Sequence, residues 1–225
     1  MRFHFDFCFV LHVAASDISS VIVDHDLYNK SVTNFKMSNI EKWKILSKED
    51  VSPSKWFPIE RHSVALPNGK ILDDYYVTTL GEVVVIVAIT VNHELVLVQQ
   101  YKHGLGEVII ELPAGMKQEN TSLIQSAANE LEEETGIKVD PSAFIYLGKL
   151  CNNPTKSNQV SHGYLITDVT FNSQQQLDDT EEISVLTYPV SVVPDIVKDG
   201  RIWSTDSACF ILLAVLEYPE IFKHG

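Results

Sequence analysis

Three glutamates near the middle of the chain, Glu130, Glu133 and Glu134, have the spacing of one helical face. Residues at i, i+3 and i+4 of an α-helix project from the same side, so the three carboxylates are neighbours. Like charges at this spacing repel one another, and a divalent cation would remove that cost. Carboxylate oxygens are the ligands that Mg²⁺ and Mn²⁺ prefer. Acidic helix faces are usually just solvated, so these three residues alone leave both interpretations open.

The element that must position these glutamates is a helix predicted over residues 122–135, which Gly136 ends. Before it, the extended run 108–110 leads into a Pro-Ala-Gly turn at residues 113–115. The helix also has an apolar stripe that would pack on a sheet, formed by Leu123, Ile124, Ala127, Ala128 and Leu131.

The segment 111–137 resembles the Nudix box, G-x5-E-x7-R-E-U-x-E-E-x-G-U, in which U is aliphatic. Two positions differ, since Thr121 replaces the first glutamate of the box and Asn129 replaces its arginine. The segments ELPAG and QQYKHG are similar to the branch of ADP-ribose and nucleoside-diphosphate-sugar pyrophosphatases, and the resemblance extends over residues 43–213. The residues that occupy box positions without a gap are Gly115, Glu130, Leu131, Glu133, Glu134, Gly136 and Ile137.

This resemblance implies an α/β fold: a Nudix-type α/β/α sandwich with a mixed central sheet, plus a small N-terminal antiparallel β unit. It implies that Mg²⁺, or Mn²⁺, is the cofactor. The family's metal ligands correspond to Glu130, Glu134 and the backbone carbonyl of Ala114, with Glu133 binding directly or through water. Glu111 is placed to contact a second metal or the substrate.

The implied reaction is Mg²⁺-dependent hydrolysis of the pyrophosphate bond of a nucleoside diphosphate sugar, with ADP-ribose as the leading substrate. The products would be a nucleoside monophosphate and a sugar phosphate. If a side chain acts as general base, Glu133 or Glu182 is the candidate; water activated by the metal needs no further residue. Alternatives are a pyrophosphohydrolase for a dinucleotide or nucleoside triphosphate, and a Nudix-fold binding or regulatory module. The departures at Thr121 and Asn129 favour the module, and the retained glutamates oppose it.

Substrate contacts are predicted from the same resemblance. Relatives have basic residues near the substrate phosphates where this chain has Lys102, and a substrate-contacting loop where it has Lys156. Trp56 is a candidate for stacking on a nucleobase, although packing within a sheet is the commoner role of such an aromatic.

The neutral residues at the two departing box positions have predicted local roles. Thr121 stands at the start of the helical pattern and is a candidate N-cap. Asn129 is expected to form a hydrogen bond across the turn.

Composition limits the function classes further. The chain has 225 residues, 45% of them hydrophobic, and a net charge of −13. This balance disfavours binding to nucleic acid or to an anionic membrane, since both require a basic surface. Three scattered cysteines indicate free thiols in a reducing compartment, so a cytoplasmic location is expected. An apolar run as long as the roughly 20 residues of a membrane span is absent from the sequence.

Three segments are predicted along the chain. Residues 1–36 fit poorly with the rest and are interpreted as a disordered extension, or as sequence upstream of a true start at Met37; a signal peptide is the alternative. Residues 37–79 form the N-terminal β unit, with strands at 56–65 and 71–78, and by resemblance this unit helps to form a homodimer. Residues 80–225 form the Nudix domain. The core-facing residues expected on its last helix, 204–217, are Leu212, Leu213, Val215 and Leu216.

Overall fold

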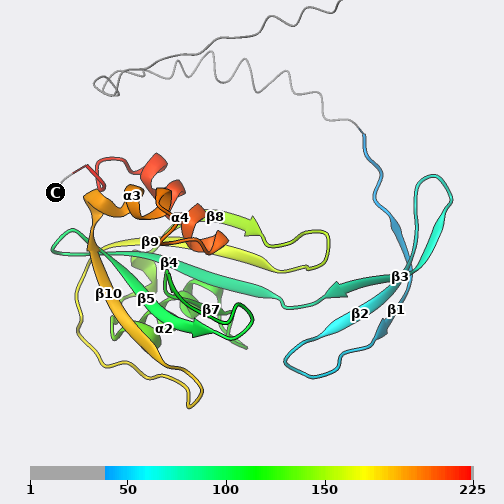
Figure 1. Ribbon diagram of the computed structural model, residues 1–225, viewed down its shortest axis with the longest axis horizontal. Helices are drawn as coiled ribbons and strands as arrows, with labels where there is room; N and C mark the ends of the chain where they lie inside the picture. The colour runs from blue at the N-terminus through cyan, green and yellow to red at the C-terminus, as the bar shows by residue number, and fades with distance from the viewer. Residues whose placement is uncertain (1–38, 224–225) are drawn as a thin grey trace, which may run out of the picture. The chain divides into compact units, whose positions relative to one another are not determined.

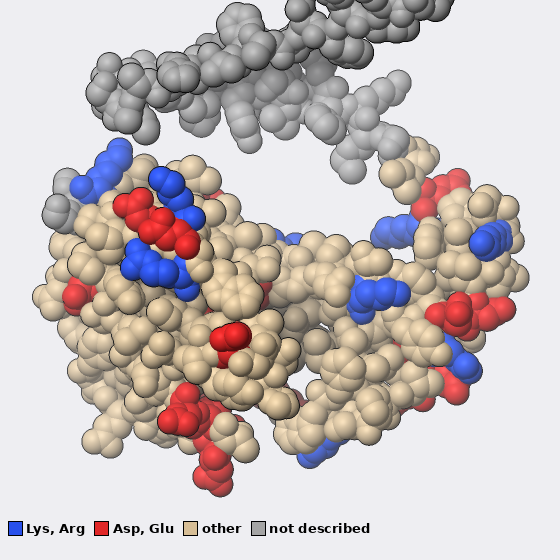
Figure 2. All heavy atoms as spheres, viewed as in Figure 1, with Lys and Arg blue, Asp and Glu red and all other residues tan. Residues whose placement is uncertain are grey.

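The computed structural model describes residues 39–223, and its contacts place the chain from Trp43 onwards in one compact unit. The extension predicted over residues 1–36 lies outside the described residues. No helix among the described residues has both the length and the apolar composition needed to cross a membrane. Figure 2 shows one face of the molecule, on which acidic and basic side chains are interspersed among uncharged ones.

A small antiparallel sheet precedes the rest of the fold, as predicted, but it has three strands where two were predicted (Figure 1). Its strands, in the order β1-β2-β3, are β1 (Lys44–Asp50), β2 (Ile59–Ala65) and β3 (Ile71–Thr78). The β2–β3 turn is the Pro-Asn-Gly sequence at residues 67–69, where Gly69 has a φ of 83° that favours glycine. Strand β1 was not predicted, because it is exposed along its whole length and lacks the alternation of a half-buried strand. Strand β2 begins at Ile59, three residues after the predicted start at residue 56.

The second sheet is mixed. Its path is β10-β5-β4-β9-β8, in which β4 and β9 are parallel and the other neighbours are antiparallel; β6 pairs with β5, and β7 with β4. The strands are β4 (Glu82–Thr90), β5 (Glu94–Lys102), β6 (Glu107–Glu111), β7 (Ala114–Met116), β8 (Ile145–Cys151), β9 (Val160–Val169) and β10 (Ile183–Pro189).

The centre of this sheet is split between β4 and β5. These strands pair directly only at Ile89 and Leu95, beside their connecting turn. Beyond that point β6 pairs along β5 and β7 pairs along β4. The Leu112–Pro113 link between β6 and β7 therefore lies within the opening and places the Pro-Ala-Gly segment in the middle of the sheet. The turn predicted over residues 113–115 was partly wrong, because Ala114 and Gly115 belong to strand β7 and pair with β4.

Helices cover both faces of the mixed sheet, which confirms the predicted sandwich (Figure 1). On one face, Ala127, Ala128 and Leu131 of α2 (Leu123–Thr135) pack in a buried cluster with Val84 and Ile86 of β4. On the other face, buried residues of α3 (Val193–Lys198) and α4 (Thr205–Glu217) pack with Val85 and Val87. Alternate residues of β4 thus enter the two cores, as expected for a strand covered on both sides. Short 3₁₀ turns occupy Pro141–Ala143 and Val190–Val192.

The predicted core side of the last helix was partly wrong. Leu212 and Leu216 are 43% and 76% exposed, whereas Phe210, Ile211 and Ala214 are fully buried. Helix α4 is apolar on most of its circumference, so its sequence pattern does not specify which side faces the sheet.

Candidate active site

A cavity of about 580 Å³ lies between helix α2 and strand β7. Its wall combines residues from β7, from the following loop, from α2 and from the segment before β10. Three of the predicted site residues of α2 line it together with Ala114. The carboxylates of the wall are Glu130, Glu133, Glu134, Asp178 and Glu181.

Helix α2 has well-defined ends that set the direction of its acidic face. The N-cap is Ser122, whose hydroxyl accepts a hydrogen bond from the Gln125 N–H at 3.2 Å. The capping role predicted for Thr121 was therefore wrong by one residue, since both are good N-caps and only the backbone path selects between them. At the other end Gly136 has a φ of 73°, and a Cβ there would lie 2.8 Å from the Ser173 carbonyl oxygen.

Gly115 allows the turn to approach the acidic helix closely. A Cβ added to it would lie 2.1 Å from a carboxylate oxygen of Glu130. Any larger residue would therefore displace this carboxylate. The glycine is required by the close packing of turn and carboxylate, which is a chemical reason for its place in the motif.

Burial and mutual repulsion make two of the glutamates weak acids. Burial raises the pKa of Glu134 to about 8, although the hydrogen bond that it accepts from the Ala114 N–H at 2.9 Å acts in the opposite direction. Burial raises the pKa of Glu130 to about 7, followed in importance by the charges of Glu133 and Glu181. Both shifts mean that the negative charges of this cavity are poorly compensated by the protein.

The donor set fits a divalent cation of the Mg²⁺ type. All the acidic groups are carboxylates, and a bound cation would offset the charge repulsion and the cost of burial. Within residues 39–223, however, no three acidic, histidine or cysteine side chains already converge as a closed group of ligands. Glu134 is turned towards the Ala114 N–H, and Glu133 accepts hydrogen bonds from Gln118.

The structure places Lys102 and Glu111 beside each other. The ammonium of Lys102 lies 2.6 Å from the carboxylate of Glu111, which also accepts a hydrogen bond from the Gln100 amide at 2.8 Å. Both charges act on Glu134, since Lys102 lowers its pKa and Glu111 raises it. Lys102 therefore neutralises a carboxylate at the edge of the site and is not a free cation.

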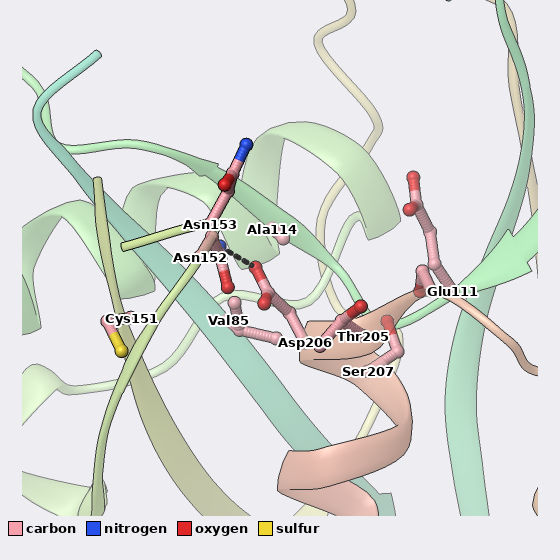
Figure 3. Close-up of a pocket in the computed structure, with 10 residues that line it drawn as sticks. Val85, Glu111, Ala114, Cys151, Asn152, Asn153, Thr205, Asp206 and Ser207 are labelled. Carbon is pink, nitrogen blue, oxygen red and sulfur yellow. Dashed lines mark hydrogen bonds between the residues drawn. The ribbon is translucent and has the colours of Figure 1, made fainter. Parts of the chain in front are cut away.

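A second cavity of about 400 Å³ lies between β7 and the start of α4 (Figure 3). Ala114 lines both cavities, whereas the predicted site residue Glu111 lines only this second one. In its wall the Asn152 amide donates to one carboxylate oxygen of Asp206 at 2.9 Å. The buried Ser161 hydroxyl, which does not line the cavity, donates to the same oxygen at 2.7 Å. Because Ala114 belongs to both cavities, strand β7 separates two polar spaces on opposite faces of the sheet.

Four predicted residues line neither cavity: Lys102, described above, and Lys156, Trp56 and Glu182. The Lys156 ammonium stands over the ring of Tyr75 in β3, 4.8 Å from its centre. Trp56 is 80% exposed in the β1–β2 connection. Glu182 lines a small separate cavity beside β5, whereas its neighbour Glu181 lines the carboxylate cavity.

Sequence reasoning missed Gln118, Asp178 and Glu181 as site residues. Asp178 and Glu181 belong to an acidic cluster that resembles a solvated turn in sequence, and only the fold brings it to α2. Gln118 has no sequence signal at all, because its place in the site depends on hydrogen bonds to α2.

Two family models match this chain. The family model described as the NUDIX domain matches residues 79–204, and the one described as the nucleoside diphosphate sugar hydrolase N-terminal domain matches residues 43–78. The structure is similar to that of an ADP compounds hydrolase, with a TM-score of 0.70 and 23% identity, over 82% of this chain and 97% of the other. This likeness supports the fold.

Curated relatives include proteins with different names. A methanol dehydrogenase activator of Bacillus methanolicus is 26% identical over 84% of this chain and 100% of that protein. An ADP-ribose pyrophosphatase of Bacillus subtilis is 25% identical over 76% of this chain and 91% of its own length. An ADP-sugar pyrophosphatase of Mus musculus is 29% identical over 55% of this chain and 60% of its own.

Proposed function

Since the chain belongs to the NUDIX family, we propose that it hydrolyses the pyrophosphate bond of a nucleoside diphosphate sugar in an Mg²⁺-dependent reaction. ADP-ribose is the leading substrate, and the products are a nucleoside monophosphate and a sugar phosphate. The observation that carries the proposal is the cavity into which α2 presents Glu130, Glu133 and Glu134. The names of the bacterial and mouse pyrophosphatases agree with this substrate class.

In this proposal Glu130, Glu133, Glu134 and the Ala114 carbonyl are the groups that would bind Mg²⁺ or Mn²⁺. The bound cation would neutralise the diphosphate and lower the pKa of a water molecule. The protein's own contribution is to orient the carboxylates on a rigid helix. Glu181 replaces Glu182 as the candidate general base beside Glu133, because only Glu181 lines the carboxylate cavity.

A role in regulating another enzyme is the second candidate function. The observation that favours it is the methanol dehydrogenase activator, which is matched along 100% of its length. Such a role is compatible with hydrolysis, and it would become the main function if the purified protein bound nucleotide sugars without cleaving them.

We also propose a homodimer formed through the N-terminal sheet. Strand β1 is an edge strand with its whole length exposed, and an unprotected edge of this kind is a site for pairing with another chain. Large apolar side chains are also exposed on this sheet and directly before it, among them Ile45, Ile71 and Trp43. Light scattering at micromolar concentration is expected to give the mass of a dimer. A monomer with full activity would exclude a contribution of the partner's sheet to the site.

The decisive experiment is a product assay of the purified protein with Mg²⁺ and a panel of nucleotide sugars, dinucleotides and nucleoside triphosphates. ADP-ribose is expected to give AMP and ribose 5-phosphate. The matched control is Glu132→Gln, which alters a glutamate of the same helix outside the cavity lining; this variant should retain activity. Cleavage of triphosphates or dinucleotides but of no nucleotide sugar would overturn the proposed substrate class.

A further inference from the structure

A line of side-chain amides connects the outer surface of α2 to the carboxylate of Glu133. The Gln125 amide donates to the Asn129 carbonyl oxygen at 2.9 Å, and the Asn129 amide donates to the Gln118 side-chain oxygen at 2.5 Å. The Gln118 amide then faces both carboxylate oxygens of Glu133 at 3.3 Å. We call Gln125, Asn129 and Gln118 the amide relay.

The direction of the relay is determined at its inner end. An ionised carboxylate can only accept hydrogen bonds, so Gln118 must present its NH₂ group to Glu133. The side-chain oxygen of Gln118 must then face Asn129, so the NH₂ group of Asn129 donates to it. The side-chain oxygen of Asn129 remains free to accept a hydrogen bond from the Gln125 amide. Each amide in the line is therefore oriented by the one that follows it.

The backbone of Gln118 is fixed independently by a ring of hydrogen bonds. Its N–H donates to the hydroxyl of Ser126, which is fully buried, at 3.1 Å. The Ser126 and Thr121 hydroxyls lie 2.6 Å apart, and the Thr121 hydroxyl donates to the Gln118 carbonyl at 2.9 Å. The backbone N–H, the backbone carbonyl and the side chain of Gln118 are thus all hydrogen-bonded to α2 or to the loop that precedes it.

Glu133 has little other support. It is half-buried in the cavity wall, and within residues 39–223 the only hydrogen bonds recorded to its carboxylate come from Gln118. Gln118 also lines the cavity. Groups that orient a ligand carboxylate from behind commonly affect metal affinity or activity by about 10–100-fold.

We propose that Gln118 is a positioning residue for Glu133, and that the neutral amide relay, which includes Asn129 at a charged position of the box, holds it in place. Gln118 acts through Glu133, and its side chain also opposes the rise that burial causes in the pKa of the neighbouring Glu130. The inference rests on the proposed function, in which Glu133 contributes to metal binding. It explains how the site keeps an oriented carboxylate although both charged positions are lost.

Asn129→Asp tests the direction of the relay with almost no change in shape. The carboxylate introduced at position 129 cannot donate to the Gln118 oxygen, so the Gln118 amide must rotate and turn its oxygen towards Glu133. We expect kcat to fall by about 10-fold or more while KM changes little. Mn²⁺ binding without substrate, measured by electron paramagnetic resonance, is expected to weaken.

The sign of the Mn²⁺ effect separates positioning from simple electrostatics, because an added negative charge near the site would by itself strengthen cation binding. Ser122→Asp is the control for an added charge on the same helix: it lies about 10 Å from position 129 along the helix axis, retains an N-cap residue and leaves the relay intact. It is expected to keep the wild-type kcat and to bind Mn²⁺ at least as tightly. Thermal unfolding of each variant shows whether the fold is retained.

Wild-type kcat and Mn²⁺ affinity in a folded Asn129→Asp protein would overturn the positioning role. If that variant fails to fold, Gln118→Met takes its place, because it keeps the length of the side chain without a donor; the same losses are expected and the same wild-type values would overturn the inference. If the wild type cleaves no nucleotide sugar but Asn129→Asp binds Mn²⁺ more weakly than the wild type does, the positioning role is supported and the proposed substrate is rejected. Normal cleavage that is unaffected by Asn129→Asp would reject the positioning role alone.

Discussion

Replacing Glu134 with glutamine is expected to make the metal-free protein more stable and the enzyme less active. The side chain is 5% exposed and accepts a hydrogen bond from the Ala114 N–H at 2.9 Å. Glutamine has a similar shape and retains an oxygen for this bond. The substitution therefore removes the buried charge and leaves the local packing unchanged.

The sign of the stability change follows from the raised pKa. The pKa is 4.5 for the group in its reference state and about 8 in the folded protein, with burial as the main cause. Between these pH values the unfolded chain releases a proton that the folded protein retains, so stability decreases as pH rises through this interval. The pKa difference of 8 − 4.5 = 3.5, at 1.36 kcal/mol per pH unit, sets an upper limit of about 5 kcal/mol above pH 8. Glu134→Gln should recover a part of this free energy.

The assay is thermal unfolding in EDTA at pH 5 and at pH 8.5. The variant is expected to unfold several degrees above the wild type at pH 8.5, since 1 kcal/mol shifts Tm by about 2–4 °C at this chain length. At pH 5 the difference should nearly vanish. The matched control is Glu132→Gln, whose carboxylate has a pKa lowered by hydrogen bonds from Lys138 and Ser173, so its loss should not stabilise the protein. A Glu134→Gln variant that is less stable than the wild type at pH 8.5 would refute this reasoning.

The same variant should lose activity with Mg²⁺. Removal of one ligand charge is expected to lower the rate by about 10²-fold or more, the scale of losing a group that stabilises the transition state. Higher stability together with lower activity in this variant would show that the buried Glu134 carboxylate destabilises the fold but is needed for the reaction. An unchanged rate would mean that this face of α2 has no part in the reaction.

Three further outcomes are expected. EDTA should abolish hydrolysis and Mg²⁺ or Mn²⁺ should restore it, so full activity in EDTA would contradict a metal mechanism. Gly115→Ala should lower kcat/KM by about tenfold or more because its Cβ meets the Glu130 carboxylate at 2.1 Å, whereas Gly104→Ala, which meets nothing within 4 Å, should be neutral. Glu181→Gln should lower kcat in a direct rate assay, while Glu182→Gln should leave it close to the wild-type value; the reverse order would restore Glu182 as the candidate base.

Local sequence was sufficient to predict the acidic helix. The spacing of its glutamates, the polar residues at its start and Gly136 at its end are properties of neighbouring residues, and the observed helix, Leu123–Thr135, differs from the prediction by one residue. The Pro-Asn-Gly turn and β3 were predicted for the same reason. A turn or a helix end is specified by the φ and ψ preferences of a few consecutive residues, which the sequence contains explicitly.

Tertiary structure decided which other groups join these glutamates. Glu181 lies 47 positions beyond Glu134 in the sequence, and its place in the cavity depends on how the segment before β10 returns to α2. Gln118 reaches Glu133 only because the turn enters the split between β4 and β5. Lys156 was expected near phosphate but lies on Tyr75 of β3. Contacts between distant segments depend on packing of the whole chain, and a polar side chain takes whichever partner that packing supplies.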